Sequence, residues 1–210
     1  RLPEFKLPEC VDSDCAVEVC DAVAVPRYSV RTIEGVKVAP SPKWLQDRLE
    51  AVGLRPINNV VDVTNYVMLE TGHPLHAFDK RAISGNQIQV RWAEVDEKLI
   101  TLDGVERKLS AEMLVIADDE KALALAGVMG GANSEVVDDT TTVVLEAACF
   151  EAATIRATAK DLGLHTDASY RFQRGVCADS VAAASERAAI LLMELAGAAS
   201  CSVLADAYAA

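Results

Sequence analysis

Aromatic and basic residues are both scarce in this sequence. Aromatic side chains make up 5% of the 210 residues while hydrophobic residues make up 51%, so the core has to consist of Val, Leu, Ile and Ala. That apolar content excludes wholesale disorder. The 20 Lys and Arg residues are outnumbered by 32 Asp and Glu residues, and the net charge is −12. A broad phosphate-binding surface needs clustered basic residues, so a nucleic acid is expected as a partner only if its end alone enters a site.

Long hydrophobic runs and targeting segments are also missing. No stretch approaches the roughly 20 apolar residues that span a membrane, and no signal peptide precedes the domain, so we expect a cytoplasmic location without membrane association. The chain starts at Arg1 in a Pro- and Glu-rich stretch without an initiator Met, which we interpret as a segment cut from a longer polypeptide. Its length suffices for one domain, or for two small lobes that share a core.

The cysteines lack the spacing of a zinc site. Cys10, Cys15 and Cys20 follow one another at intervals of five, which matches neither a C-x2-C motif nor one face of a helix. We therefore predict that these three, together with Cys149, Cys177 and Cys201, are reduced thiols rather than metal ligands or disulfides.

Strands and helices are expected in blocks rather than in strict alternation. β-Branched and alternating residues predict an edge strand within 15–20 and strands at 28–38, 87–93, 98–102, 106–109, 113–117, 122–126 and 141–148. Helical periodicity predicts helices at 43–52, 60–69, 151–162 and 180–195, the first of them with Ser41 as N-cap and Pro42 at its first position. This order favours an α+β layered domain over a doubly wound sheet.

Two of the three histidines lie in the stretch 58–79, which has the highest density of polar groups in the chain. His73 and His76 are three residues apart, a spacing that on a helix binds metal, but Pro74 between them argues against a regular helix. His76 follows the turn at Gly72 and Pro74, so it is either a polar group lining a cleft or a hydrogen-bonded structural histidine.

Three further stretches have both a functional and a structural interpretation. Glu146 is a single acid within an apolar strand, and it either lines a pocket or faces outward. The glycines in 127–131 either let backbone N–H groups approach a ligand or form a tight turn. Thr166 or Asp167 is expected to cap a short helix.

Several ordered blocks resemble the B3/B4 region of the β subunit of bacterial phenylalanyl-tRNA synthetase. These blocks are residues 55–66 (RPINNVVDVTNY), 72–79 (GHPLHAFD), 126–131 (AGVMGG), 145–147 (LEA), 163–169 (GLHTDAS) and 171–176 (RFQRGV). The family more often has Gln at position 73 and Glu at position 173, neither of which we assign to chemistry. The resemblance implies a sandwich of mostly antiparallel sheets packed with helices, over residues 26–200, between an N-terminal segment (1–25) and a C-terminal tail (201–210).

In that family this region hydrolyses tyrosine wrongly attached to tRNA(Phe). The resemblance implies that His76 positions the attacking water or the terminal ribose, and that Glu146 binds the tyrosine hydroxyl. It also implies that the pocket is lined by Asn65, Pro74, Gly127, Gly130, Gly131, Thr166 and Ala168.

The resemblance implies partners as well. These are the 3′ CCA end of tRNA(Phe), the tyrosyl ester, and a synthetase α subunit in an α2β2 assembly. It implies no cofactor or metal in this domain, since ATP and Mg belong to the ligase site elsewhere in the enzyme. The alternative function is a non-catalytic B3/B4-like module with a structural or ligand-binding role.

Overall fold

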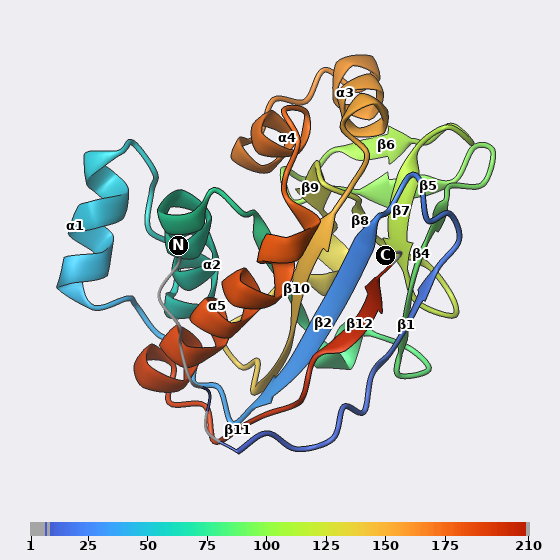
Figure 1. Ribbon diagram of the computed structural model, residues 1–210. Helices are drawn as coiled ribbons and strands as arrows, with labels where there is room; N and C mark the ends of the chain where they lie inside the picture. Colours follow the sequence, from blue (N-terminus) through green and yellow to red (C-terminus); the bar gives the residue numbers. More distant parts are fainter. Residues whose placement is uncertain (1–6, 8, 209–210) are drawn as a thin grey trace.

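The computed structural model describes residue 7 and residues 9–208. The predicted Pro- and Glu-rich start of the chain and the last two residues of the predicted tail fall almost wholly outside this range. Within the described residues the chain forms two stacked sheets, a small hairpin and five α-helices (Figure 1). The α+β class and the mostly antiparallel sandwich are confirmed, because β1 with β4 is the one parallel pair among the named strands of this part of the chain.

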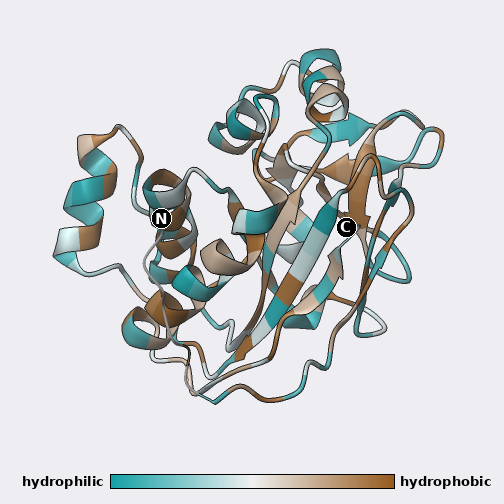
Figure 2. Cartoon of the chain, viewed as in Figure 1, coloured by the Kyte–Doolittle hydropathy of each residue, from teal (hydrophilic) through white to brown (hydrophobic). Residues whose placement is uncertain are grey.

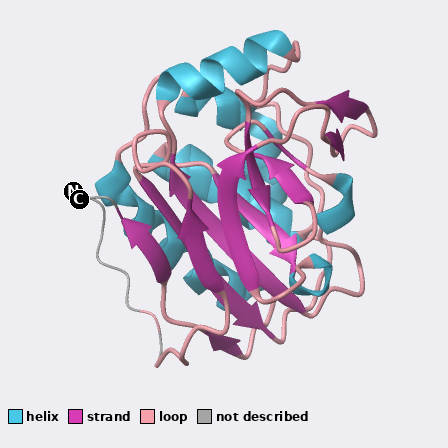
Figure 3. Ribbon diagram, turned by 90° about the vertical axis from the view of Figure 1, so that its right-hand side faces the viewer, coloured by secondary structure: helices cyan, strands magenta, loops and turns pink. Residues whose placement is uncertain are grey.

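The central sheet has the order β11-β2-β10-β3, with β12 pairing with β2 next to β11. Its strands are β2 (Arg27–Glu34), β3 (Leu75–Asp79), β10 (Thr142–Cys149), β11 (Ser200–Cys201) and β12 (Ala205–Tyr208). The second sheet has the order β1-β4-β7-β8-β9. It consists of β1 (Ala16–Val19), β4 (Gln87–Trp92), β7 (Leu114–Ala117), β8 (Ala122–Leu125) and β9 (Met129–Gly130). Figure 3 shows the strands from the side of the second sheet, with helices around them.

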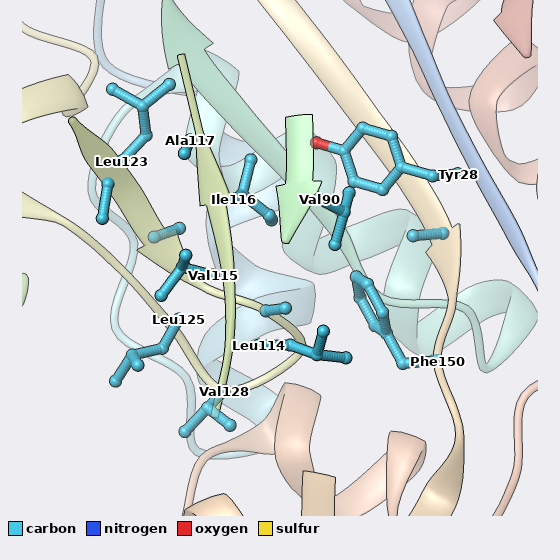
Figure 4. Packing of buried hydrophobic residues seen from close by; sticks show 14 of the residues in the cluster. Tyr28, Val90, Leu114, Val115, Ile116, Ala117, Leu123, Leu125, Val128 and Phe150 are labelled. Carbon is cyan, nitrogen blue, oxygen red and sulfur yellow. The ribbon is translucent and has the colours of Figure 1, made fainter. Parts of the chain in front are cut away.

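The two faces of the central sheet bury different partners because side chains alternate along a strand. Tyr28, Phe78 and Val144 point toward the second sheet and pack with residues such as Val90 and Leu114. Figure 4 shows this cluster, with the Tyr28 ring pointing from β2 into the space between the sheets. The alternate residues of the same strands pack against helices on the other face.

Those helices are α2 (Asn59–Thr71) and α5 (Val181–Leu195), and α1 (Lys43–Ala51) packs on α2. Val143 and Leu145 of β10 meet Val63 of α2 and Ala188 of α5 in a second core. The helices α3 (Ala152–Asp161) and α4 (Asp167–Phe172) cover one end of the sandwich (Figure 1). Figure 2 colours each residue by hydropathy. In it β7 is hydrophobic along its length, whereas β2 contains both hydrophobic and hydrophilic residues.

Most predicted elements are present, and the differences have local causes. The hairpin of β5 (Lys98–Ile100) and β6 (Glu106–Lys108) and the edge position of β1 are confirmed. The strand predicted at 28–38 ends at Glu34, because Gly35 adopts a positive φ of 75°. The predicted N-cap Ser41 is wrong. Pro42 occupies that position, and the Ser41 hydroxyl instead donates to the buried Asp62 carboxylate at 2.6 Å.

The two predicted flanking segments, 1–25 and 201–210, contribute strands to the sheets. β1 lies in the predicted N-terminal segment and pairs with β4. β12 lies in the predicted tail and pairs with β2, and the Arg27 guanidinium binds the Asp206 carboxylate at 2.7 Å. Pairing of this kind satisfies backbone groups at the edge of the central sheet, which an isolated tail would leave open.

Candidate functional site

A cavity of about 390 Å³ lies where the edge strands of the two sheets, β3 and β9, approach each other. Its walls come from β3, β10, the turn between β8 and β9, and the helices α2 and α4. All the predicted site residues except Gly131 line it: Asn65, Pro74, His76, Gly127, Gly130, Glu146, Thr166 and Ala168. Among these predicted residues, Asn65 and Ala168 are 103 positions apart in the sequence, yet both line the same cavity.

Glu146 and His76 occupy directly opposed positions on the adjacent antiparallel strands β10 and β3. Opposed residues of such a pair point to the same face of the sheet, in this case the face between the two sheets. Glu146 is only 6% exposed, and its Oε2 has no hydrogen-bond partner among the described residues. Burial raises the pKa of Glu146 to about 8, while the nearby Tyr28 hydroxyl acts in the opposite direction. The carboxyl is therefore mostly protonated at neutral pH. The burial of Glu146 and its place in the cavity wall exclude the outward-facing alternative.

The His76 ring is held by two close neighbours. It packs edge-on against Phe78, with 4.6 Å between the ring centroids, and it lies against Gly130. The ring is partly exposed to the cavity, but its Nε2 is buried without a partner in the described part of the chain. Burial lowers the pKa of His76 to about 4. The imidazole is therefore neutral at pH 7 and has both a donor and an acceptor nitrogen.

The His76 ring occupies the space that a side chain at position 130 would fill. A Cβ at this position would lie 2.8 Å from the His76 Nε2. Met129 and Gly130 form β9, so the glycine-rich segment is part strand and part turn, with a positive φ of 66° at Gly127. The Gly131 N–H donates to the Leu123 carbonyl at 2.9 Å. Gly131 therefore packs against the backbone of β8, and this contact explains why Gly131 lies outside the cavity wall.

The helices supply the remaining polar wall. α4 begins with Thr166 as N-cap, as predicted, in a capping box with Ser169. The Thr166 hydroxyl also donates to the Val128 carbonyl at 2.8 Å, and this bond fastens α4 to the turn that precedes β9. On α2, Asn65 is half-buried and faces the cavity, and its amide has no hydrogen-bond partner in the described chain. The amide is thus available to a ligand.

Two acids at the cavity were missed by the sequence analysis. Glu135 and Asp167 are exposed and line the cavity, and Asp167 forms an ion pair with Arg171 at 3.0 Å. Glu135 follows the short helix η2 (Ala132–Ser134) in a polar loop, where nothing in the sequence distinguishes it from neighbouring acids. Only the folded structure brings its carboxylate to the cavity.

His73 does not share the site of His76. It is 1% exposed, and its Nδ1 lies 3.0 Å from the Ser180 hydroxyl oxygen just before α5. Burial lowers the pKa of His73 to about 4. In residues 7 and 9–208 no three His, Cys, Asp or Glu side chains gather in a way that could hold a metal ion. No helix in the same range is long and apolar enough to cross a membrane.

Comparison with known proteins gives close relatives. The chain is 50% identical over 201 residues to the "Phenylalanine--tRNA ligase beta subunit" of Desulfotalea psychrophila, covering 95% of this chain and 25% of that protein. It is 54% identical over 181 residues to the protein of the same name from Geobacter metallireducens, covering 86% and 23%. The chain thus spans about a quarter of the length of these relatives.

A solved structure shares the fold. It is an N-terminal fragment of the phenylalanyl-tRNA synthetase β subunit from Pyrococcus horikoshii, with a TM-score of 0.52 and 16% identity over 77% of this chain and 51% of that one. The sequence model of the B3/4 domain family matches residues 24–197. Since this match spans most of the sequence, the chain belongs to the B3/4 domain family.

Proposed function

We propose that this chain is the editing domain of a phenylalanyl-tRNA synthetase β subunit and hydrolyses the ester of mischarged Tyr-tRNA(Phe). The observation that carries the proposal is the pair Glu146 and His76, opposed on adjacent strands in one cavity wall, whose side chains have no hydrogen-bond partner among the described residues. Unpartnered buried polar atoms are costly, and they are expected where a ligand supplies the missing bonds.

Glu146 provides the selectivity in this proposal. Tyrosine and phenylalanine differ by one hydroxyl, and an apolar pocket discriminates poorly against the added hydroxyl. A site with a buried polar group rejects the ligand that leaves this group unpaired, by on the order of 10⁴-fold in favourable cases. The neutral Glu146 carboxyl can accept a hydrogen bond from the phenol and also donate one.

Hydrolysis of an aminoacyl ester needs a positioned water and donors for the oxyanion, because the ester is already activated. The neutral His76 imidazole accepts a hydrogen bond from the water or from the terminal ribose. The N–H groups of Val128 and Gly131 donate to Leu125 and Leu123 within the sheet and are therefore occupied. We assign the oxyanion to other donors at the wall, above all the unpartnered Asn65 amide.

The charges of the site suit a substrate that enters by its end. The net charge of −12 is unfavourable for the body of a tRNA, so only the CCA end approaches this domain and the rest binds elsewhere in the synthetase, beside the α subunit. Glu135 at the cavity is placed to attract the α-ammonium group of the aminoacyl ester. The reaction needs no metal or nucleotide in this domain and takes place in the cytoplasm.

Deacylation of Tyr-tRNA(Phe) and Phe-tRNA(Phe) tests this function, with this chain and with the complete synthetase that contains it. The parent is expected to hydrolyse the tyrosyl ester in preference to the phenylalanyl ester. Glu146→Ala is expected to abolish that preference, and His76→Ala to lower hydrolysis of both esters about 10²-fold. Glu194→Gln on the exposed side of α5 is the control.

The competing hypothesis is a non-catalytic B3/B4-like module. It predicts no hydrolysis of either ester by the complete synthetase and no effect of the two variants. Hydrolysis that persists with unchanged preference in Glu146→Ala would likewise remove Glu146 from the mechanism.

A further inference from the structure

Four buried side-chain polar atoms lack a hydrogen-bond partner in the part of the chain that the structure describes, and three of them share one face of the central sheet. The three are the Tyr28 hydroxyl on β2, Oε2 of Glu146 on β10, and Nε2 of His76 on β3. The strand order β2-β10-β3 places these residues side by side across the sheet. Buried polar groups without hydrogen bonds are destabilising, so a row of three in a core indicates an interaction for each of them.

Tyr28 is a diagonal neighbour of Glu146. Glu146 pairs with Val30, and Tyr28 stands two residues from Val30 on the same face of β2. Diagonal neighbours lie about 7–8 Å apart at the backbone, a span that an aromatic and a long side chain together bridge. The interaction is mutual: Glu146 is the main charged neighbour of the Tyr28 hydroxyl, and Tyr28 is the side chain that acts on Glu146.

Tyr28 does not reach the ligand itself. Its side chain is fully buried and is absent from the cavity wall, whereas Glu146 lines that wall. Tyr28 packs among Phe150 and the cluster between the sheets, where Figure 4 shows its hydroxyl pointing into the interior. Glu146 therefore stands between the Tyr28 hydroxyl and the cavity, with Oε2 as its buried oxygen.

We propose that Tyr28 is a positioning residue for Glu146: its hydroxyl donates to the buried Oε2 and leaves the other carboxyl oxygen directed to the tyrosine hydroxyl in the cavity. The Tyr28 hydroxyl and the Glu146 Oε2 are both buried and without a hydrogen-bond partner among the described residues, and each acts on the pKa of the other residue. Binding of the phenol to the outer oxygen fixes the carboxyl and completes the bond to Tyr28. This inference rests on the proposed role of Glu146.

The groups around Glu146 limit the alternatives. His76 on β3 is neutral at pH 7 because of its low pKa, and Glu135 and Asp167 line the cavity as exposed acids. Cys15, near Tyr28, is a buried thiol whose pKa is raised by burial. Among these described neighbours, Tyr28 is the side chain whose hydroxyl acts on the Glu146 carboxyl, which makes it the donor we assign to the inner oxygen.

Tyr28→Phe removes the hydroxyl and keeps the ring, so the fold is expected to persist. The first measurement is the titration of the Glu146 carboxyl by ¹³C NMR in this chain, with the signal assigned by its loss in Glu146→Gln. Because the hydroxyl holds the pKa of Glu146 down, Tyr28→Phe is expected to move the titration midpoint upward by about one pH unit. The control is Tyr208→Phe on β12, which removes a hydroxyl that donates to Asp179.

The second measurement is the preference for Tyr-tRNA(Phe) over Phe-tRNA(Phe) in deacylation by the complete synthetase. Tyr28→Phe is expected to lower it about tenfold, with Tyr208→Phe unchanged. An unshifted Glu146 titration in Tyr28→Phe overturns the inference, whether or not the domain hydrolyses esters. A shifted titration without any hydrolysis by the parent enzyme supports the contact between the two residues and refutes the editing function instead. An unchanged preference alongside a shifted titration overturns the positioning role.

Discussion

At the scale of single residues, the site depends on two groups that burial keeps neutral, a carboxyl that is ordinarily charged at pH 7 and an imidazole. Burial raises the pKa of Glu146 to about 8 and lowers that of His76 to about 4, so neither charge is present in the empty cavity at pH 7. A neutral acid next to a neutral imidazole avoids the high cost of a buried ion. It also leaves hydrogen-bonding capacity that only a polar ligand satisfies.

These shifts predict how stability depends on pH. The pKa of Glu146 is raised from 4.5, so its contribution to stability is full below pH 4.5 and is lost as the pH rises toward 8. His73 and His76 have pKa values lowered from 6.5 to about 4, so their contributions are full above pH 6.5 and are lost as the pH falls toward 4. These three groups together place the stability maximum near pH 6.5.

Between pH 6.5 and 8 the decline belongs to Glu146 and amounts to about 1.4 kcal/mol per pH unit at most. Glu146→Gln is expected to remove this decline and to steepen the rise between pH 4.5 and 6.5, where Glu146 opposes the two histidines. The free energy of unfolding from urea titrations at a series of pH values measures both. A decline of the same slope in the variant would show that another group is responsible.

A second prediction concerns the absence of a side chain at position 130. In Gly130→Ala the new methyl group overlaps the His76 ring, with the Cε1 atom at 2.6 Å, so the ring has to move. Displacement of a positioning group by about 1 Å costs on the order of 10²-fold in rate, and this loss is expected in Tyr-tRNA(Phe) deacylation with little change in thermal stability.

Gly131→Ala provides the contrast to that variant. Its methyl group meets the Leu123 carbonyl oxygen, part of the backbone, and cannot be relieved by a side-chain rotation. Gly131→Ala is therefore expected to lower the melting temperature, whereas Gly130→Ala is expected to lower the rate of Tyr-tRNA(Phe) deacylation. Equal rates in Gly130→Ala and the parent would mean that the packing of His76 against β9 is unimportant for hydrolysis.

At the scale of elements, the cap of α2 follows sequence preference, whereas the cap of α1 does not. Asn58 caps α2 by accepting from the N–H groups of Val60 and Val61 at 3.0 and 2.9 Å. Ser41, a good capping residue by type, caps nothing. Its hydroxyl and the Ile57 N–H both donate to Asp62, which is fully buried in α2. The buried carboxylate needs a donor for each oxygen, whereas water can satisfy the start of an exposed helix.

Ser41→Ala is therefore expected to destabilise the protein by about 1–3 kcal/mol through Asp62, not through α1. A double-mutant cycle with Asp62→Asn measures this coupling by urea unfolding, and hydrogen exchange of α1 amides serves as the control. Additive losses in the cycle, or selective fraying of α1, would favour the capping role instead.

At the scale of the whole molecule, the central sheet is completed by the end of the chain. β12 pairs with Arg27–Val30 of β2, the segment that contains Tyr28, and so covers one edge of the sheet behind the cavity. The opposite edge strand, β3, carries His76 and borders the cavity. One edge is thus covered by β12, whereas the strand at the other edge borders the cavity.

Removal of residues 203–210 is expected to lower the melting temperature by about 5–10 °C and to promote association through the exposed edge of β2. The cause is the loss of the β12 pairing and of the ion pair between Arg27 and Asp206. A chain that ends at Tyr208 is the control. Calorimetry and light scattering report the two effects, and a truncated chain as stable and monomeric as this control would contradict the structural role of β12.

The sequence by itself determined the local features. Alternation and turn residues indicated most strands and the hairpin, and Thr166 was recognisable as a cap because capping depends on residues within one turn. Glu146 was conspicuous because a single acid in an apolar strand needs a partner. The resemblance to the B3/B4 region then assigned the wall residues, of which only Gly131 lies outside the cavity lining.

Only the tertiary structure decided which of these residues meet. The opposition of Glu146 and His76 depends on the register of β10 with β3, which long-range packing selects and no local pattern encodes. The register of β10 with β2 brings Tyr28 near Glu146 from a third strand, although in the sequence Tyr28 resembles an ordinary core residue. The packing of α2 and α5 on one face of the sheet leaves these three polar groups together on the other.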